Sequence, residues 1–141
     1  MARLPQYRSK LVPAQIAEGM TRALKNAERL AEDAESLLKA GRAPSAVALA
    51  ILSIEESGKV TILRQMATAS EEKEWADLWK AYRSHTKKNT LWIFGELVQR
   101  GAKTLDELRP VADPDSDHPD VLDQLKQISI YTDCFTDAKW S

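Results

Sequence analysis

Two adjacent glutamates and a lysine follow an unusually apolar stretch of the chain. Residues 52–60 read LSIEESGKV, directly after a nearly unbroken apolar run over residues 46–52. On a helix at least one of Glu55 and Glu56 must approach an apolar stripe, where a charge is costly unless it is paired. Lys59 can supply a partner, because it follows Glu55 by four residues and Glu56 by three. Two interpretations stay open: local pairs on a helix that leaves the core, or a buried site or network.

The second segment whose residues could do chemistry is YRSHTKKN, residues 82–89. His85 lies on the apolar stripe of its helical pattern, so it is either a packed core residue or a group for acid–base work near neutral pH. Arg83, Lys87 and Lys88 surround it and could bind phosphate. His118 lies in an acidic loop and is expected at the surface.

Several kinds of chemistry find no support in the sequence. The chain has one cysteine, Cys134, and two histidines, so a conventional zinc site and an internal disulfide are not expected. A glycine-rich phosphate loop, a His-Glu-x-x-His motif and a nucleophile elbow are all absent. Trp75, Trp79 and Trp92 recur at helical spacing, which favours core packing over base stacking. We therefore expect neither a metal nor a cofactor.

Composition indicates an ordinary globular domain. The 141 residues carry a formal net charge of −1, which gives no whole-chain argument for nucleic acid or membrane. The basic start lacks an apolar signal core, and the longest apolar run is too short to span a bilayer, so we expect a cytoplasmic protein without membrane partners. Residues 1–30 and 80–103 each carry six Lys or Arg, and these stretches could form one positive face in the fold.

Hydrophobic periodicity predicts helices throughout. We expect helices over residues 13–40, 44–67, 71–100 and 119–131, with Gly41 and Gly101 as C-terminal caps and Ser70 as an N-cap. The third can break near SHTKKN, residues 105–108 can form a short turn, and RPVADPDSDHP reads as irregular loop. Gly58 either permits close helix packing or is simply tolerated. The prediction is one all-α domain over residues 1–141, an up-and-down bundle of four to five helices with residues 1–12 as a flexible N-terminal segment.

Residues 23–63, ALKNAERLAEDAESLLKAGRAPSAVALAILSIEESGKVTIL, resemble the AbiV-type abortive infection proteins of bacteria, which belong to the HEPN group of helical domains. The resemblance continues through YRSHTKK and LDQLKQISIYTDCFTDAKW, in the same order along the chain. The matching elements are Asn26-Ala27, Asp33-Ala34, Leu37-Leu38, Glu55-Glu56-Ser57-Gly58-Lys59, Arg83-x-His85-x-x-Lys88 and Tyr131-x-Asp133.

This resemblance implies a HEPN-like bundle, commonly a homodimer, that defends against phage by arresting the host. Many HEPN proteins are metal-independent ribonucleases with an Arg-x4–6-His motif, which this chain lacks; Lys80 stands where that arginine could be. In a ribonuclease, His85 would exchange a proton with RNA, and Arg83 or Lys88 would stabilise phosphate charge. Glu55 or Glu56 would orient His85 or the lysine. The network residues implied are Lys59, Tyr131 and Asp133.

Alternatives to a ribonuclease stay open at this level. A non-enzymatic module could bind a phage protein, a component of the translation machinery or a nucleotide, with Glu55, Glu56, Lys59 and His85 as a buried polar network. The chain could also be the HEPN half of a toxin–antitoxin pair.

Overall fold

The computed structural model describes residues 4–90 and 92–132, and these contain helices and no strand. The chain is all-α, as predicted. The elements are α1 (Pro13–Lys39), α2 (Ala43–Met66), α3 (Glu72–Arg83), α4 (His85–Lys88), α5 (Trp92–Gln99), α6 (Arg109–Ala112) and α7 (His118–Ile130). In the described part, α4 and α6 are single turns, and the longer helices correspond to the predicted bundle.

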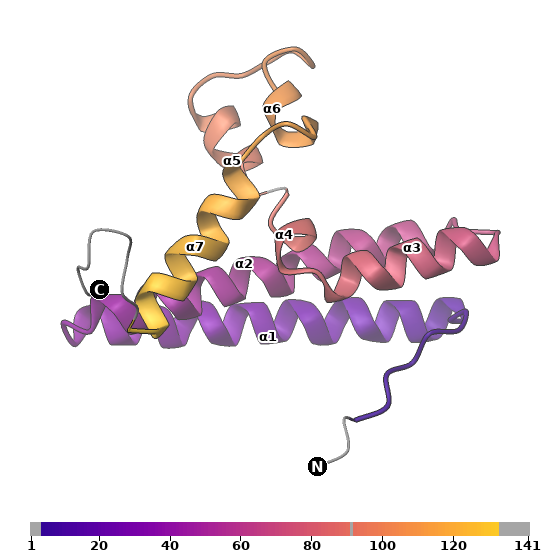
Figure 1. The fold of residues 1–141 in the computed structure, drawn as a ribbon, viewed down its shortest axis with the longest axis horizontal. Helices are drawn as coiled ribbons and strands as arrows, with labels where there is room; N and C mark the ends of the chain where they lie inside the picture. The colour runs from indigo at the N-terminus through magenta and orange to yellow at the C-terminus, as the bar shows by residue number, and fades with distance from the viewer. Residues whose placement is uncertain (1–3, 91, 133–141) are drawn as a thin grey trace.

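The helices α1 and α2 form a long antiparallel hairpin that supports the rest of the fold (Figure 1). Their contact is lined by small side chains, and the Ser53 hydroxyl donates to the Ala27 carbonyl at 2.7 Å. Gly41 ends the first helix with φ of 75°, and the Arg42 amide donates to the Leu37 carbonyl at 2.9 Å. This is the glycine cap that the sequence predicts, because only glycine adopts this left-handed conformation without strain.

The apolar core lies where α3 packs on this hairpin. Its buried members are Ile16, Ile62, Leu63, Met66, Trp75 and Trp79. The prediction of core positions is therefore confirmed for Trp75 and Trp79, whereas Trp92 is only partly buried. The predicted N-cap Ser70 is wrong, because Glu71 caps α3 and the Glu74 carboxylate accepts from the amides of both Ser70 and Glu71.

The chain breaks between α3 and α4 at Ser84, inside the predicted segment. Ser84 has extended backbone (φ −83°, ψ 132°), and its hydroxyl accepts from the Lys87 amide, so it caps the short helix α4. The new direction brings α4 across α2 at Gly58. A Cβ atom built on Gly58 would lie 2.0 Å from the Lys88 carbonyl oxygen, so this glycine permits a close helix contact.

The chain returns through α5 and α6 to α7, which descends across α2 beside α4 (Figure 1). Two predictions fail here. Residues 109–112 form α6 inside the expected loop, and His118 is buried at 9% exposure, with Nδ1 2.6 Å from the Ser116 hydroxyl and Nε2 2.9 Å from the Thr90 carbonyl. The buried histidine joins the start of α7 to the end of α4, which explains its position away from solvent.

The N-terminal segment before α1 contacts α3. The Trp79 indole N–H donates to the Ser9 carbonyl at 3.0 Å, and the Arg83 guanidinium donates to the Tyr7 carbonyl. Flexibility of residues 1–12 stays a prediction. Among the described residues no helix is long and apolar enough to cross a membrane.

Candidate functional site

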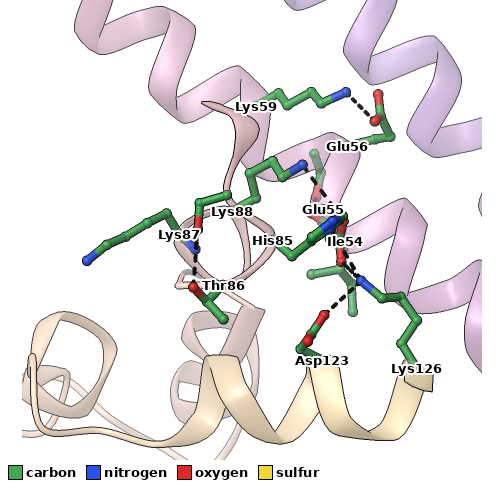
Figure 2. Close-up of polar contacts among 12 residues, drawn as sticks. Ile54, Glu55, Glu56, Lys59, His85, Thr86, Lys87, Lys88, Asp123 and Lys126 are labelled. Carbon is green, nitrogen blue, oxygen red and sulfur yellow. Dashed lines mark hydrogen bonds and ion pairs between the residues drawn. The ribbon is translucent and has the colours of Figure 1, made fainter. Parts of the chain in front are cut away.

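The structure brings the two chemical segments of the sequence together. Glu55 lies in the middle of α2, and His85 is the first residue of α4 (Figure 2). The absence of a side chain at Gly58 lets α4 pack closely against α2. The Glu55 Oε2 atom lies 2.7 Å from His85 Nδ1. A carboxylate on Nδ1 fixes the imidazole in one orientation and leaves Nε2 for other chemistry.

His85 itself is open to solvent. Its side chain is 59% exposed, whereas Glu55 is 2% exposed. Within the described residues no hydrogen bond involves His85 Nε2, because its contacts run through Nδ1. The interpretation of His85 as a packed core residue is wrong: the break at Ser84 turns it out of the apolar stripe. The geometry is a buried carboxylate that orients a solvent-facing imidazole.

Glu55 is surrounded by positive charge. Lys126 from α7 lies 2.6 Å from Oε1, and Lys88 from α4 lies 3.8 Å from Oε2. Asp123 forms an ion pair with the same Lys126 ammonium, at 2.9 Å. These two carboxylates and two ammonium groups balance one another in charge. A buried charge is tolerated only with such pairing.

Burial acts differently on the two lysines. Burial is the largest influence on the pKa of Lys88 and lowers it, against the opposing attraction of Glu55. Burial also disfavours the charged form of Lys126, but its hydrogen bonds to Glu55 and Asp123 outweigh that cost and raise its pKa. Lys126 is therefore the main counter-charge of Glu55, and Lys88 is the less satisfied ammonium.

Glu56 takes no part in this cluster and forms a second pair. Its carboxylate bonds Lys59, the i,i+3 partner, so the alternative pairing of Lys59 with Glu55 is not formed. Burial raises the pKa of Glu56, but hydrogen bonds to Lys59 and Asn26 together lower it below its usual value of 4.5. The contact with Asn26 links α1 to α2, and Lys59 lies over the Tyr82 ring of α3, at 5.2 Å from its centroid.

Glu56→Gln is expected to lower the free energy of unfolding at neutral pH by about 1–2 kcal/mol. Because the folded-state pKa is depressed, this stabilisation is present above the unfolded value of 4.5 and is lost as pH falls through the folded pKa. Urea unfolding from about pH 6 to pH 3 should therefore show a shallower acid dependence in the variant. Glu35→Gln, whose carboxylate pairs Lys39 at 64% exposure, is the control and should leave the dependence unchanged. A wild-type acid dependence in Glu56→Gln would contradict the role.

Three of the clustered groups have the donor types of a metal site. Ligand atoms of Glu55, His85 and Asp123 all lie within 4.8 Å of one another. The ammonium of Lys126, however, hydrogen-bonds Glu55 and forms an ion pair with Asp123, so it supplies the positive charge that a metal ion would bring. A divalent ion would have to displace this buried cation. The residues therefore favour acid–base chemistry without metal.

Other residues predicted for the site lie elsewhere. Arg83 is not part of the Glu55 cluster: its guanidinium bonds the carbonyls of Tyr7 and Trp79 and stacks over the Trp79 ring. Tyr131 is 61% exposed at the end of α7, and Asp133 lies outside the described residues.

Lys126 and Asp123 are the site residues that sequence reasoning missed. The predicted helix over residues 119–131 carries Leu122, Leu125 and Ile128 at helical spacing, but Leu125 and Ile128 are 45% and 51% exposed, and Lys126 is buried at 5%. The available signal was a lysine four residues after Leu122, in register with a buried position.

Comparison with known proteins gives one family match. The sequence model of the HEPN_AbiV family, described as AbiV, matches residues 15–141. Searches of curated proteins and of solved structures found no significant match. The matched range contains every residue of the Glu55 cluster.

Proposed function

This chain belongs to the AbiV family of HEPN domains, and on that basis we propose that it is a metal-independent ribonuclease with His85 as its general base. Family membership implies abortive infection, a general form of phage defence. The ribonuclease activity is the finer step, and it is supported above all by the 2.7 Å contact between buried Glu55 and solvent-facing His85. The resemblance to this family also supports a homodimer that acts on host or phage RNA, and we propose that it acts in the cytoplasm.

The proposed reaction uses the ribose hydroxyl as nucleophile. His85 Nε2 accepts the proton of a 2′-hydroxyl, whose oxygen forms a bond to the adjacent phosphorus. The bond from phosphorus to the 5′-oxygen breaks, that oxygen takes a proton from water, and the resulting hydroxide recovers the proton from the His85 imidazolium. The products are a 2′,3′-cyclic phosphate and a 5′-hydroxyl end. Glu55 acts through His85: it holds the ring orientation and stabilises the imidazolium that forms.

A second candidate function is a non-enzymatic module that binds a phage protein or a translation component. The absence of the Arg-x4–6-His motif favours it, as does the buried contact of Lys126 with Glu55 and Asp123, which is what a structural network requires. In that case His85 would be one end of a polar network that fixes how the helices pack against one another, and it would take part in no reaction.

We expect His85→Ala to reduce RNA cleavage by about 100-fold or more, because positioned general bases typically contribute that much. The measurement is cleavage of single-stranded RNA with EDTA present, with the product ends identified. The melting temperature should stay close to that of the wild type, because the ring is largely exposed. Lys87→Gln, on the same short helix and also exposed, is the matched control. Equal cleavage by wild type and His85→Ala, or cleavage by neither, would rule out the ribonuclease and leave the binding module.

A further inference from the structure

Two adjoining hollows lie where the N-terminal segment passes α3. One is lined by Arg8, Lys80 and Arg83. The other is lined by Lys59, Arg83 and Lys88. Trp79 and Arg83 line both hollows, so the hollows share a wall, and no acidic side chain lines either one. We call this surface the α3 groove. It brings Arg8, from the basic stretch 1–30, close to Lys80, Arg83 and Lys88 from the basic stretch 80–103.

The positive charge of the α3 groove is only partly neutralised. Within the described residues Arg8, Lys80 and Arg83 form no salt bridge. Lys59 pairs Glu56, and Lys88 faces Glu55 from 3.8 Å. Cationic walls without carboxylates attract a negatively charged ligand, and the attraction is stronger in a hollow than on a flat surface.

Lys88 gives the second observation that points to a ligand. It is 8% exposed, yet in the described structure its ammonium has no hydrogen-bond acceptor. The nearby Glu55 oxygens already bond His85 and Lys126 at shorter distances, and Lys59 adds a second positive charge close by. Figure 2 shows Lys59 and Lys88 extending from α2 and α4 toward the same region. Glu55 faces this ammonium only from 3.8 Å, so a bound anion would give it the close acceptor that Glu55 does not.

Arg83 is held in place between the hollows. Its guanidinium donates to the Trp79 carbonyl at 3.3 Å and to the Tyr7 carbonyl, and it lies 5.1 Å from the Trp79 ring centroid. Carbonyl contacts and ring stacking fix the side chain without removing its charge. The wall shared by the two hollows is therefore both cationic and ordered before any ligand binds.

We propose that the α3 groove binds the phosphodiester backbone of single-stranded RNA, with neighbouring phosphates in the two hollows. This inference rests on the proposed ribonuclease function, because it names how the same substrate is held. A polyanion fits better than one small anion, since five cations are spread over two adjoining hollows. Lys88 connects the groove to the reacting group, because it lies between the groove and the Glu55–His85 pair.

The test measures RNA binding separately from cleavage, in the His85→Ala background. Fluorescence anisotropy of labelled single-stranded RNA should show at least about tenfold weaker binding for the added double substitution Arg8→Gln and Lys80→Gln. The slope of log K against log salt should fall by roughly 0.7 for each phosphate that the variant no longer neutralises. Both side chains are exposed, so folding should be unaffected. Arg83→Gln removes the shared cation and should weaken binding further.

The matched control is Lys39→Gln with Lys73→Gln, which removes two exposed charges elsewhere and should leave the salt slope unchanged. If the control and the groove variant lose binding equally, RNA responds to net charge and the groove is not its site. If inorganic phosphate competes with RNA at matched ionic strength and raises the melting temperature only while the groove is intact, the groove holds a free phosphate instead. If the wild type cleaves RNA and the groove variants bind RNA as well as their parent, this inference is overturned and the ribonuclease proposal stands. If binding depends on the groove but the wild type does not cleave RNA, only the ribonuclease proposal is overturned.

Discussion

Glu55→Gln is expected to lower the free energy of unfolding by about 3–5 kcal/mol, the range found when one member of a buried ion pair is removed. The glutamine keeps the shape of the side chain but leaves two buried ammonium groups, Lys126 and Lys88, with less compensation. It also removes the acceptor of His85 Nδ1, so cleavage should fall together with stability. Urea denaturation at neutral pH measures the first effect directly.

A double-substitution cycle separates the ion pair from general damage to α2. Lys126→Gln alone should also destabilise, because Glu55 then loses its closest cation. The combination of Glu55→Gln with Lys126→Gln should cost less than the sum of the two, by about 1–3 kcal/mol, because neither member of the Glu55–Lys126 pair then stays charged without the other. Additive effects would show that the contact contributes little. The exposed pair of Glu35 and Lys39 provides the comparison, since exposed pairs typically contribute about 1 kcal/mol or less.

Gly58→Ala is expected to destabilise by about 3 kcal/mol, at the upper end of the usual cost of overpacking. The added Cβ would lie 2.0 Å from the Lys88 carbonyl oxygen, and the atom in its way is backbone, which cannot rotate aside. Either α4 moves off α2 or the helix contact breaks. Both outcomes displace His85 from Glu55, so catalysis should fall even in the fraction that folds.

Gly95→Ala is the matched control for this effect. Gly95 lies in α5, where a new Cβ meets no atom within 4 Å, so alanine should be neutral or stabilising by up to about 1 kcal/mol. Thermal unfolding of both variants, with RNA cleavage measured at a temperature where each is folded, tests the proposal. A Gly58→Ala protein with wild-type stability and activity would show that the close approach of α4 is not needed to position His85.

The local features of this fold could be predicted from the sequence. The starts of α1 and α2 fall within a residue of prediction, and Gly41 ends the first helix as expected. These features depend on apolar periodicity and on the left-handed conformation of glycine, both of which act over a few residues. The break at Ser84 was foreseen only as an option, because a serine can either continue a helix or cap the next one.

The sequence by itself determined an all-α chain of the AbiV type, with a charged segment that had to approach its apolar core. It could not decide which glutamate enters that core. Tertiary packing buries Glu55 between His85 of α4 and Lys126 of α7, whereas Glu56 pairs with Lys59 on its own helix. The partner Lys126 lies 71 residues away on α7. Its burial, with Leu125 and Ile128 left exposed, reflects the high cost of an unpaired buried charge, which no local pattern records.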